Sequence, residues 1–395
     1  MARDRLVPLF AVAVITAGIV GIAGNDSDSL DGFISFMTVF ITTVAIFSVF
    51  ALGLNVQWGY TGIFNFGIVA FFMVGAYTSA LVTKAPSSGE FVRYVGGLDL
   101  AENLGPLNLE GLTGFVIGLL AAAAMCGIVA FLVAIPALRL REDYLAIATI
   151  GIAEVFRRIA IEEEGLVNGT RGLTGIPRPL HDLVSPPDYK YIYFGIAVVV
   201  LLIIFVAIER AARSPWGRVL KAIREDELAT AASGKNIWAF RVQAFVLGAM
   251  IMGVGGAVYS ANQGSIVPDT FSHFFGTFII WAMLMVGGSG SNRGAIVGAY
   301  VVWGFWTLAG LIQPHVPEFA EALRLQHLRS DLPQELEDRT PYVRDLLIGL
   351  LIVVVLLLRP KGLMGEERRV SLFAGEEDKR EPSPMRASAA GSGEE

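Results

Sequence analysis

Residues 191–241 read YIYFGIAVVVLLIIFVAI, then ERAA, then RSPWGRVLKAIREDELATAASGKNIWAFR. The first part is an uncharged apolar run, long enough to cross a bilayer as a helix, which takes roughly 17–25 residues. The last part, Arg213–Arg241, is polar, basic and helix-prone, and another apolar run follows it. A polar helical segment between two membrane spans is either an inert connection or a docking surface, and the choice bears directly on function.

The composition places the whole chain in a membrane. It is 54% hydrophobic and only 17% charged, and the charges are clustered between long uncharged runs. This pattern predicts an all-α polytopic membrane protein with about ten transmembrane helices. The first run follows Arg3 and Arg5 as in a signal peptide, but its length predicts a retained helix. The predicted spans are Leu6–Gly24, Phe33–Asn55, Ile63–Thr83, Gly114–Leu138, Tyr144–Ile161, Tyr191–Ile208, Val242–Asn262, Ser272–Gly288, Gly294–Ile312 and Val343–Leu358.

Lysine and arginine in the short loops predict the orientation, because cytoplasmic loops carry an excess of both. With ten crossings, four basic clusters fall on one side, so the N-terminus, the loop Arg213–Arg241 and the C-terminus are all predicted to be cytoplasmic. The loops of the other side carry mainly Asp and Glu. The basic clusters are Arg3 and Arg5, Arg139 and Arg141, Arg210 to Arg241, and Arg359 to Arg369.

The chain offers no room for a soluble catalytic domain. Its polar stretches reach about thirty residues, too few to fold alone, and it has no GxxxxGK[ST] phosphate loop. The glycine-rich run Gly287–Gly294 lacks the Lys-Ser/Thr ending and predicts a tight cytoplasmic turn. The tail 366–395 is rich in Glu, Ser, Ala and Pro, so it is predicted to be disordered. Residues 1–365 are the predicted membrane domain, and the chain is predicted not to be an enzyme.

The sequence offers few ligands for metals or coupling ions. Cys126 is the single cysteine, and no histidine has a partner at metal-ligand spacing. We therefore predict no metal site, and solvated positions for His273 and the loop histidines. Glu154 is the one acidic residue with some depth in a span, and it either faces a substrate path, paired with Arg157 or Arg158, or reaches toward water. The scarcity of charged residues in the predicted spans argues against a proton- or sodium-driven carrier. A sodium site built from backbone carbonyls and hydroxyls would, however, be compatible with the sequence.

Capping signals divide the polar segment into two short helices. Ser214 and Pro215 predict a helix start, with Ser as the N-cap and Pro at the first helical position. Asp226 predicts the cap of a second helix that runs to Ser233, and Gly234 supplies a residue able to adopt positive φ. Two capped helices with few large apolar residues fold poorly alone and favour a groove in another chain. This pattern predicts a docking surface.

Four blocks of sequence carry a resemblance to a known family. They are ALGLNVQWGYTGIFNFGIVAFFMVGAYTSALV at 51–82, LRLREDYLAIATIGIAEVFRRI at 138–159 continuing as NGTRGLTGIPR at 168–178, residues 213–262, and residues 268–299, which contain MLMVGGSGSNRGAIVGA. In this order they resemble the LivM-type permease subunit of branched-chain amino-acid ABC transporters. The chain departs from the family pattern in an apparent external insertion at 313–340, in longer external loops, and in Asn65-Phe66 before Gly67.

The resemblance implies a permease subunit of an ABC importer. It would move branched-chain or related hydrophobic amino acids inward across the plasma (inner) membrane of a prokaryote. The implied partners are a second, LivH-like permease, two ABC ATPase subunits that bind the ATP and Mg, an extracytoplasmic solute-binding protein, and the lipid bilayer. No cofactor in this chain and no nucleic acid are implied.

The same resemblance assigns roles to two sets of residues. Residues 213–234 become coupling helices that contact the ATPase, with Trp216, Arg224, Glu225, Asp226, Glu227, Ala231 and Gly234 as the coupling residues. The candidates for the translocation path are Asn55, Gly59, Gly62, Asn65, Gly67 and Glu154.

Two alternatives to this function stay open at the level of sequence. One is an ABC permease for urea, short amides or another small solute, which the same motifs allow. The other is an ion-coupled secondary carrier, which would transport without ATPase subunits and would need Glu154.

Overall fold

Apolar helices run between two ends of the molecule, and a few short elements close those ends. The computed structural model describes residues 2–26, 29–86, 97–99 and 111–312, and between 346 and 365 residues 346, 349–351, 353–355, 357, 359 and 361–365. Residues 1–365 form one compact unit. The predicted insertion at 313–340, most of the extra length in the first long external loop, and the predicted tail at 366–395 lie outside the described residues.

The helices follow the apolar runs in chain order. The long ones are α1 (Ala2–Asp26), α2 (Leu30–Leu54), α3 (Ile68–Thr83), α5 (Leu112–Ala137), α6 (Glu142–Glu162), α8 (Tyr189–Arg213), α11 (Ile237–Gln263), α12 (Ile279–Gly287) and α13 (Asn292–Ile312). The short ones are η1 (Asn55–Gly59), α7 (Glu164–Val167), η3 (Gly169–Arg171), η4 (His181–Leu183), α9 (Pro215–Glu225), α10 (Glu227–Ala232), η5 (Pro268–Thr270) and η6 (Phe274–Phe278). The strands β1 (Leu173–Thr174) and β2 (Ser265–Ile266) pair antiparallel.

Six helices of the described residues are long and apolar enough to cross a membrane: α1, α2 continuing into η1, α5, α8, α11 and α13. The apolar helices α3 and η6–α12 are shorter. α6 covers the charged span predicted at Tyr144–Ile161, and the described residues between 346 and 357 are helical. The chain is therefore an all-α polytopic membrane protein, while the count of ten crossings stays a prediction.

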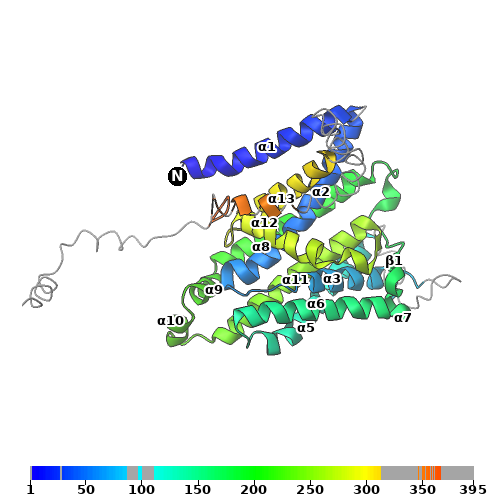
Figure 1. The fold of residues 1–395 in the computed structure, drawn as a ribbon. Helices are drawn as coiled ribbons and strands as arrows, with labels where there is room; N and C mark the ends of the chain where they lie inside the picture. The colour runs from blue at the N-terminus through cyan, green and yellow to red at the C-terminus, as the bar shows by residue number, and fades with distance from the viewer. Residues whose placement is uncertain are drawn as a thin grey trace, which may run out of the picture. The chain divides into compact units, whose positions relative to one another are not determined.

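Successive helices bring two sets of loops to opposite ends. Along one end, which we call the α9 end, lie α9 and α10, on the side where α1 begins (Figure 1). Here Leu363 N donates to Val286 O at 2.8 Å and so ties the last described residues to α12. At the other end, the β1 end, Lys84 Nζ donates to the Thr174 carbonyl, and burial lowers the pKa of that amine.

α11 lies at the centre of the bundle, in contact with α2, α3 and α5. In its apolar window 78% of the residues are buried within the chain, against 17% for α8 on the outside. Glycines make this close packing possible, as they do between membrane helices in general. A Cβ on Gly75 of α3 would stand 2.3 Å from the Gly253 carbonyl oxygen of α11.

The predicted span Ile63–Thr83 is not one helix, which corrects its start. Residues 62–67 are irregular, Gly62 has φ +75°, and α3 begins only at Ile68. Before this break the α2 helix widens into the π-helical turn η1. A positive φ is open to glycine at little cost, so Gly62 is where the chain leaves the helical path.

Replacing Gly75 with alanine tests the α3–α11 contact. The added methyl group has no space, so we expect the free energy of unfolding to fall by about 1–3 kcal/mol, as in overpacked cores. Gly151 is the matched control, because a Cβ there meets nothing within 4 Å. Thermal unfolding in detergent should show a lower midpoint for Gly75→Ala and an unchanged or higher midpoint for Gly151→Ala. Equal midpoints for the two variants would contradict the contact.

Candidate functional site

The polar segment folds as the two predicted short helices, α9 and α10. Asp226 caps α10 by accepting a hydrogen bond from Ala229 N at 2.9 Å, and Gly234 follows the helix with φ +80°. Ser214 stands at the N-cap of α9 with Pro215 at its first position. Its side chain, however, does not accept the predicted backbone hydrogen bond. Ser214 Oγ donates instead to the Ala211 carbonyl of α8 at 2.7 Å, since α9 turns directly off the end of α8.

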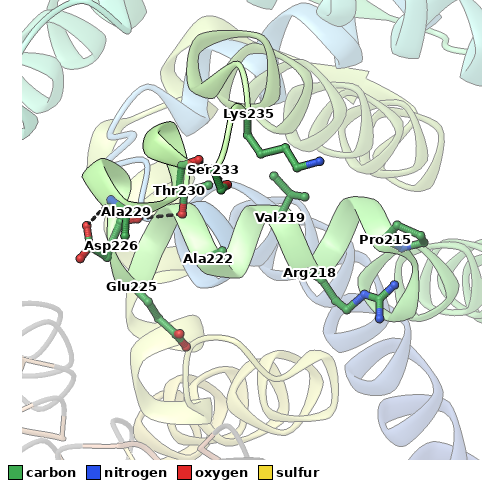
Figure 2. Close-up of a pocket in the computed structure, with 10 residues that line it drawn as sticks. All are labelled: Pro215, Arg218, Val219, Ala222, Glu225, Asp226, Ala229, Thr230, Ser233 and Lys235. Carbon is green, nitrogen blue, oxygen red and sulfur yellow. Dashed lines mark hydrogen bonds between the residues drawn. The ribbon is translucent and has the colours of Figure 1, made fainter.

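A groove of about 570 Å³ lies between α9 and α10. Figure 2 shows Arg218 and Glu225 on α9 and Lys235 beyond α10 around this groove. Its lining residues are Pro215, Arg218, Val219, Ala222, Glu225, Asp226, Ala229, Thr230, Ser233 and Lys235. Leu228 of α10, next in sequence to the lining residue Ala229, is 83% exposed, the largest exposed fraction among the described large hydrophobic residues. The segment therefore exposes one large apolar side chain among polar ones.

The predicted coupling residues divide between two faces. Glu225, Asp226, Glu227, Ala231 and Gly234 are exposed. Trp216 and Arg224 are half-buried and face the membrane helices instead. Trp216 Nε1 donates to Gln243 Oε1 of α11 at 2.9 Å, and Arg224 donates to the Gly59 carbonyl of η1.

α9 therefore lies directly against the helix break. Arg224 reaches Gly59, its Cγ lies 3.5 Å from where a Cβ on Gly62 would stand, and Lys221 Nζ lies 5.4 Å from the Tyr60 ring centroid. Leu220 on the same helix is fully buried. A displacement of α9 must therefore move these contacts to the break.

Side chains of other helices satisfy the backbone of the break. Trp281 Nε1 of α12 donates to the Asn65 carbonyl at 3.0 Å, and Thr149 Oγ1 of α6 accepts from Phe66 N at 3.0 Å. Asn65 Oδ1 accepts from Gly67 N, and its amide nitrogen donates to Gln57 Oε1, both at 2.8 Å. Irregular backbone at membrane depth needs such partners, because lipid supplies none.

Asn292, at the start of α13, joins three elements at the α9 end. Its Oδ1 accepts from Asn55 Nδ2 at 3.0 Å and from the Tyr60 hydroxyl at 2.7 Å. Its Nδ2 donates to Glu209 of α8 at 2.8 Å, and Asn55 Oδ1 accepts from Gly290 N at 2.8 Å. With Asn292 only 3% exposed, this amide fixes η1, α8 and α13 to one another.

The structure brings five of the six predicted path residues together around the break. Asn55, Asn65, Gly59 and Gly67 are buried within this chain, and Gly62 is partly buried. Glu154, on α6, is held instead by Arg157 and Arg158. The role of these residues in a path stays a prediction, and the side-chain amides of Asn55 and Asn65 are occupied by internal hydrogen bonds.

Glu154 belongs to a charged group toward the β1 end. It accepts hydrogen bonds from both Arg157 and Arg158, the two partners that the sequence offered. Whether Glu154 faces a substrate path stays a prediction. His273 is not the solvated loop histidine that we predicted. Its Nε2 lies 3.6 Å from the Glu154 carboxylate, since η5, which precedes His273 in the chain, contacts α6. Among the described residues, no group of His, Cys, Asp and Glu forms a metal-binding cluster.

Sequence reasoning missed Gln57, Glu209, Leu228 and Asn292. It named Asn55 and Asn65 but passed over the other buried amides, Gln57 and Asn292. Gln57 between apolar neighbours, and Asn292 after a glycine-rich turn, are polar side chains that burial forces into hydrogen bonds. The sequence therefore indicates that these amides form hydrogen bonds, but it does not show with which atoms.

A double-mutant cycle tests the Asn55–Asn292 pair. Each single change to alanine leaves buried polar partners unsatisfied, so we expect a loss of about 1–3 kcal/mol in the free energy of unfolding for each. The double variant should lose less than the sum, because the partners share one hydrogen bond. Denaturation of the detergent-solubilised protein measures both. Additive losses would show that the two amides do not interact.

Comparisons with known proteins agree with this architecture. A family model described as "Branched-chain amino acid transport system / permease component" matches residues 36–356. The High-affinity branched-chain amino acid transport system permease protein LivM of Escherichia coli (strain K12) is 30% identical over 288 residues, which cover 67% of this chain and 62% of the relative. Its Salmonella typhimurium namesake is 29% identical, with 66% and 60% covered.

The Probable branched-chain amino acid transport permease protein LivM of Methanocaldococcus jannaschii is 24% identical over 344 residues, covering 85% of this chain and 94% of the relative. The match spans about six-tenths of the length of the two bacterial relatives. No solved structure matches. Because the family model covers most of the chain, including the helix break and the α9–α10 segment, this protein belongs to the family of permease components of branched-chain amino acid transport systems.

Proposed function

We propose that this protein is a transmembrane permease subunit of an ABC importer. It moves branched-chain or related hydrophobic amino acids inward across the plasma membrane of a prokaryote. The names of its relatives in bacteria and archaea support this solute class. ATP is bound and hydrolysed by two separate subunits, a second, LivH-like permease completes the membrane part, and an extracytoplasmic protein delivers the solute.

The observation that carries this proposal is the two-sided construction of α9. Outward it forms, with α10, an exposed groove, and α10 also exposes Leu228. Inward it holds the Gly59 carbonyl of η1 through Arg224. A helix that contacts another chain on one side and a helix break on the other is built to transmit movement. We assign residues 213–234 to the ATPase contact on this basis.

The orientation of this proposal follows the charge distribution. The basic loop at Arg213–Arg241 places the α9 end in the cytoplasm, together with both termini, and the β1 end outside. ATP-driven closure of the two ATPase subunits then moves α9, and α9 moves the break. The membrane helices change which side the path faces, as alternating access requires.

The function as a whole is tested by uptake of leucine into vesicles that contain this chain with its four proposed partner subunits. Uptake that requires both ATP and the ATPase subunits is expected. Uptake driven by an ion gradient without those subunits would instead support the secondary carrier. Transport of urea or short amides, with no transport of leucine, would instead support an ABC permease for those solutes.

Leu228→Asp tests the contact with the ATPase. A charge at an apolar anchor typically removes much of the binding energy of an interface, so we expect ATPase subunits no longer to co-purify and uptake to fall at least about tenfold. Leu183→Asp, at the opposite end and 55% exposed, is the matched control and should retain both. Full ATPase binding by Leu228→Asp would contradict the docking role.

Arg224→Ala tests the inward contact. The change removes the hydrogen bond to Gly59 but leaves the exposed groove in place, so ATPase subunits should still co-purify and hydrolyse ATP. We expect leucine uptake per ATP to fall by about tenfold, the value of one hydrogen bond to a charged group. Arg218→Ala, on the groove side of α9, should instead weaken ATPase binding. An unchanged ratio of uptake to hydrolysis in Arg224→Ala would show that this arginine transmits nothing.

A further inference from the structure

A neutral group of four charged side chains lies on the flank of α6 that faces η5 and η6. Glu154 accepts hydrogen bonds from Arg157 at 3.0 and 3.2 Å and from Arg158 at 3.1 Å. Arg157 NH1 lies 3.6 Å from Asp269 of η5, beyond hydrogen-bond distance. His273 Nε2 lies 3.6 Å from Glu154. Two arginines balance two carboxylates here, so a ligand with a net charge would leave one charge unpaired.

Two buried polar atoms beside this group have no hydrogen-bond partner among the described residues. They are His273 Nδ1 and the Tyr77 hydroxyl. Tyr77 is only 6% exposed, and the charge of Asp269 acts on its hydroxyl. Most buried polar groups in folded proteins are paired, so unpaired ones at one place need an explanation. A polar ligand that reaches the group would supply one.

Aromatic side chains of the helix break, η6 and α12 form a second surface. The Phe66 ring of the helix break stacks on Trp281 at 4.9 Å and lies 5.9 Å from Phe278 of η6, which is 48% exposed. Phe278 follows His273 by five residues on η6. Glu154 lies eight residues before the end of α6 at Glu162, about 12 Å along the helix. Thr149 of the same helix accepts a hydrogen bond from Phe66 N at 3.0 Å. α6 therefore links the charged group to the aromatic side chains within the helices rather than at their outer ends.

We propose that this surface, the α6–η6 junction formed by Phe66, Glu154, Arg157, His273 and Phe278, binds the solute during transport. The solute class is an apolar α-amino acid in its zwitterionic form. Its carboxylate binds Arg157, its ammonium group binds Glu154, and its side chain lies on the aromatic rings. This inference rests on the proposed importer function and gives that function a place in the membrane.

The charge arithmetic favours a zwitterion over other solutes. When the zwitterion binds between Arg157 and Glu154, Arg157 pairs with its carboxylate and Glu154 pairs with its ammonium group. No charge on the protein is then left unpaired. Burying an unpaired charge is costly, and this exchange avoids that cost. Urea or a short amide carries no charges with which to compete for the ion pair. The aromatic rings add contact area, which favours the binding of a branched apolar side chain over a small one.

The experiment uses the full complex in proteoliposomes, with leucine or alanine delivered by saturating solute-loaded binding protein. Uptake and ATP hydrolysis are measured together for Arg157→Gln and Phe278→Ala. We expect Arg157→Gln to lower the uptake of both amino acids about tenfold or more, as the loss of a charge-assisted hydrogen bond does. Phe278→Ala should lower leucine uptake about tenfold more than alanine uptake, the scale on which an apolar pocket discriminates methylene groups.

Matched controls are Arg171→Gln, an exposed arginine toward the β1 end, and Phe131→Ala, on α5 and 49% exposed. Both should transport as the unchanged complex does. Normal leucine uptake in Arg157→Gln would overturn the junction while leaving the importer intact, whereas no ATP-dependent uptake in the unchanged complex would overturn the proposed function. Loss of the second permease or of binding-protein-stimulated ATP hydrolysis in Arg157→Gln would identify the junction as a protein interface and so refute the proposal.

Discussion

The break between η1 and α3 is the constraint on which the rest of the structure depends. A helix interrupted at membrane depth exposes backbone groups that neither lipid nor the helix itself can satisfy. Here side chains from three other helices supply the partners: Thr149 of α6, Thr277 of η6 and Trp281 of α12. Gln57, on the turn before the break, accepts a hydrogen bond from the Asn65 side chain. These partners fix the relative positions of their own helices. The break therefore organises its surroundings rather than merely interrupting one span.

The same constraint bears on α9. Loops on a membrane protein ordinarily move without effect on the core, but α9 is joined to η1 by Arg224, and its Leu220 is fully buried. Asn292 ties η1 in turn to α8 and α13. A displacement of α9 would therefore disturb hydrogen bonds that hold η1, α8 and α13 together. Rigid contacts of this kind favour two discrete arrangements over gradual deformation.

The sequence predicted the helices and the two caps well, because both follow from local patterns. Apolar runs of sufficient length fold as helices in a membrane, and Asp226 and Gly234 act within one turn of their own position. It failed where a side chain takes a partner that the local pattern does not indicate. Ser214 Oγ donates to the Ala211 carbonyl at the end of α8, and His273 Nε2 lies 3.6 Å from the Glu154 carboxylate of α6. Pairings across more than a hundred residues leave no mark in local composition.

The predicted path residues show the same limit, because their hydrogen-bond partners could not be read from the sequence. Sequence reasoning named Asn55 and Asn65 for a path but could not show their bonds. Both are fully buried in this chain and bonded within it, as a break in a membrane helix demands. The aromatic side chains of the break, Phe64 and Phe66, are partly exposed, and their rings lie 5.1 and 4.9 Å from that of Trp281. Polar residues thus hold the backbone of the break, while aromatic residues give it an apolar surface. In the transport that we propose, an apolar amino acid meets a surface of its own chemistry, and charge is required only where its zwitterionic end must be matched.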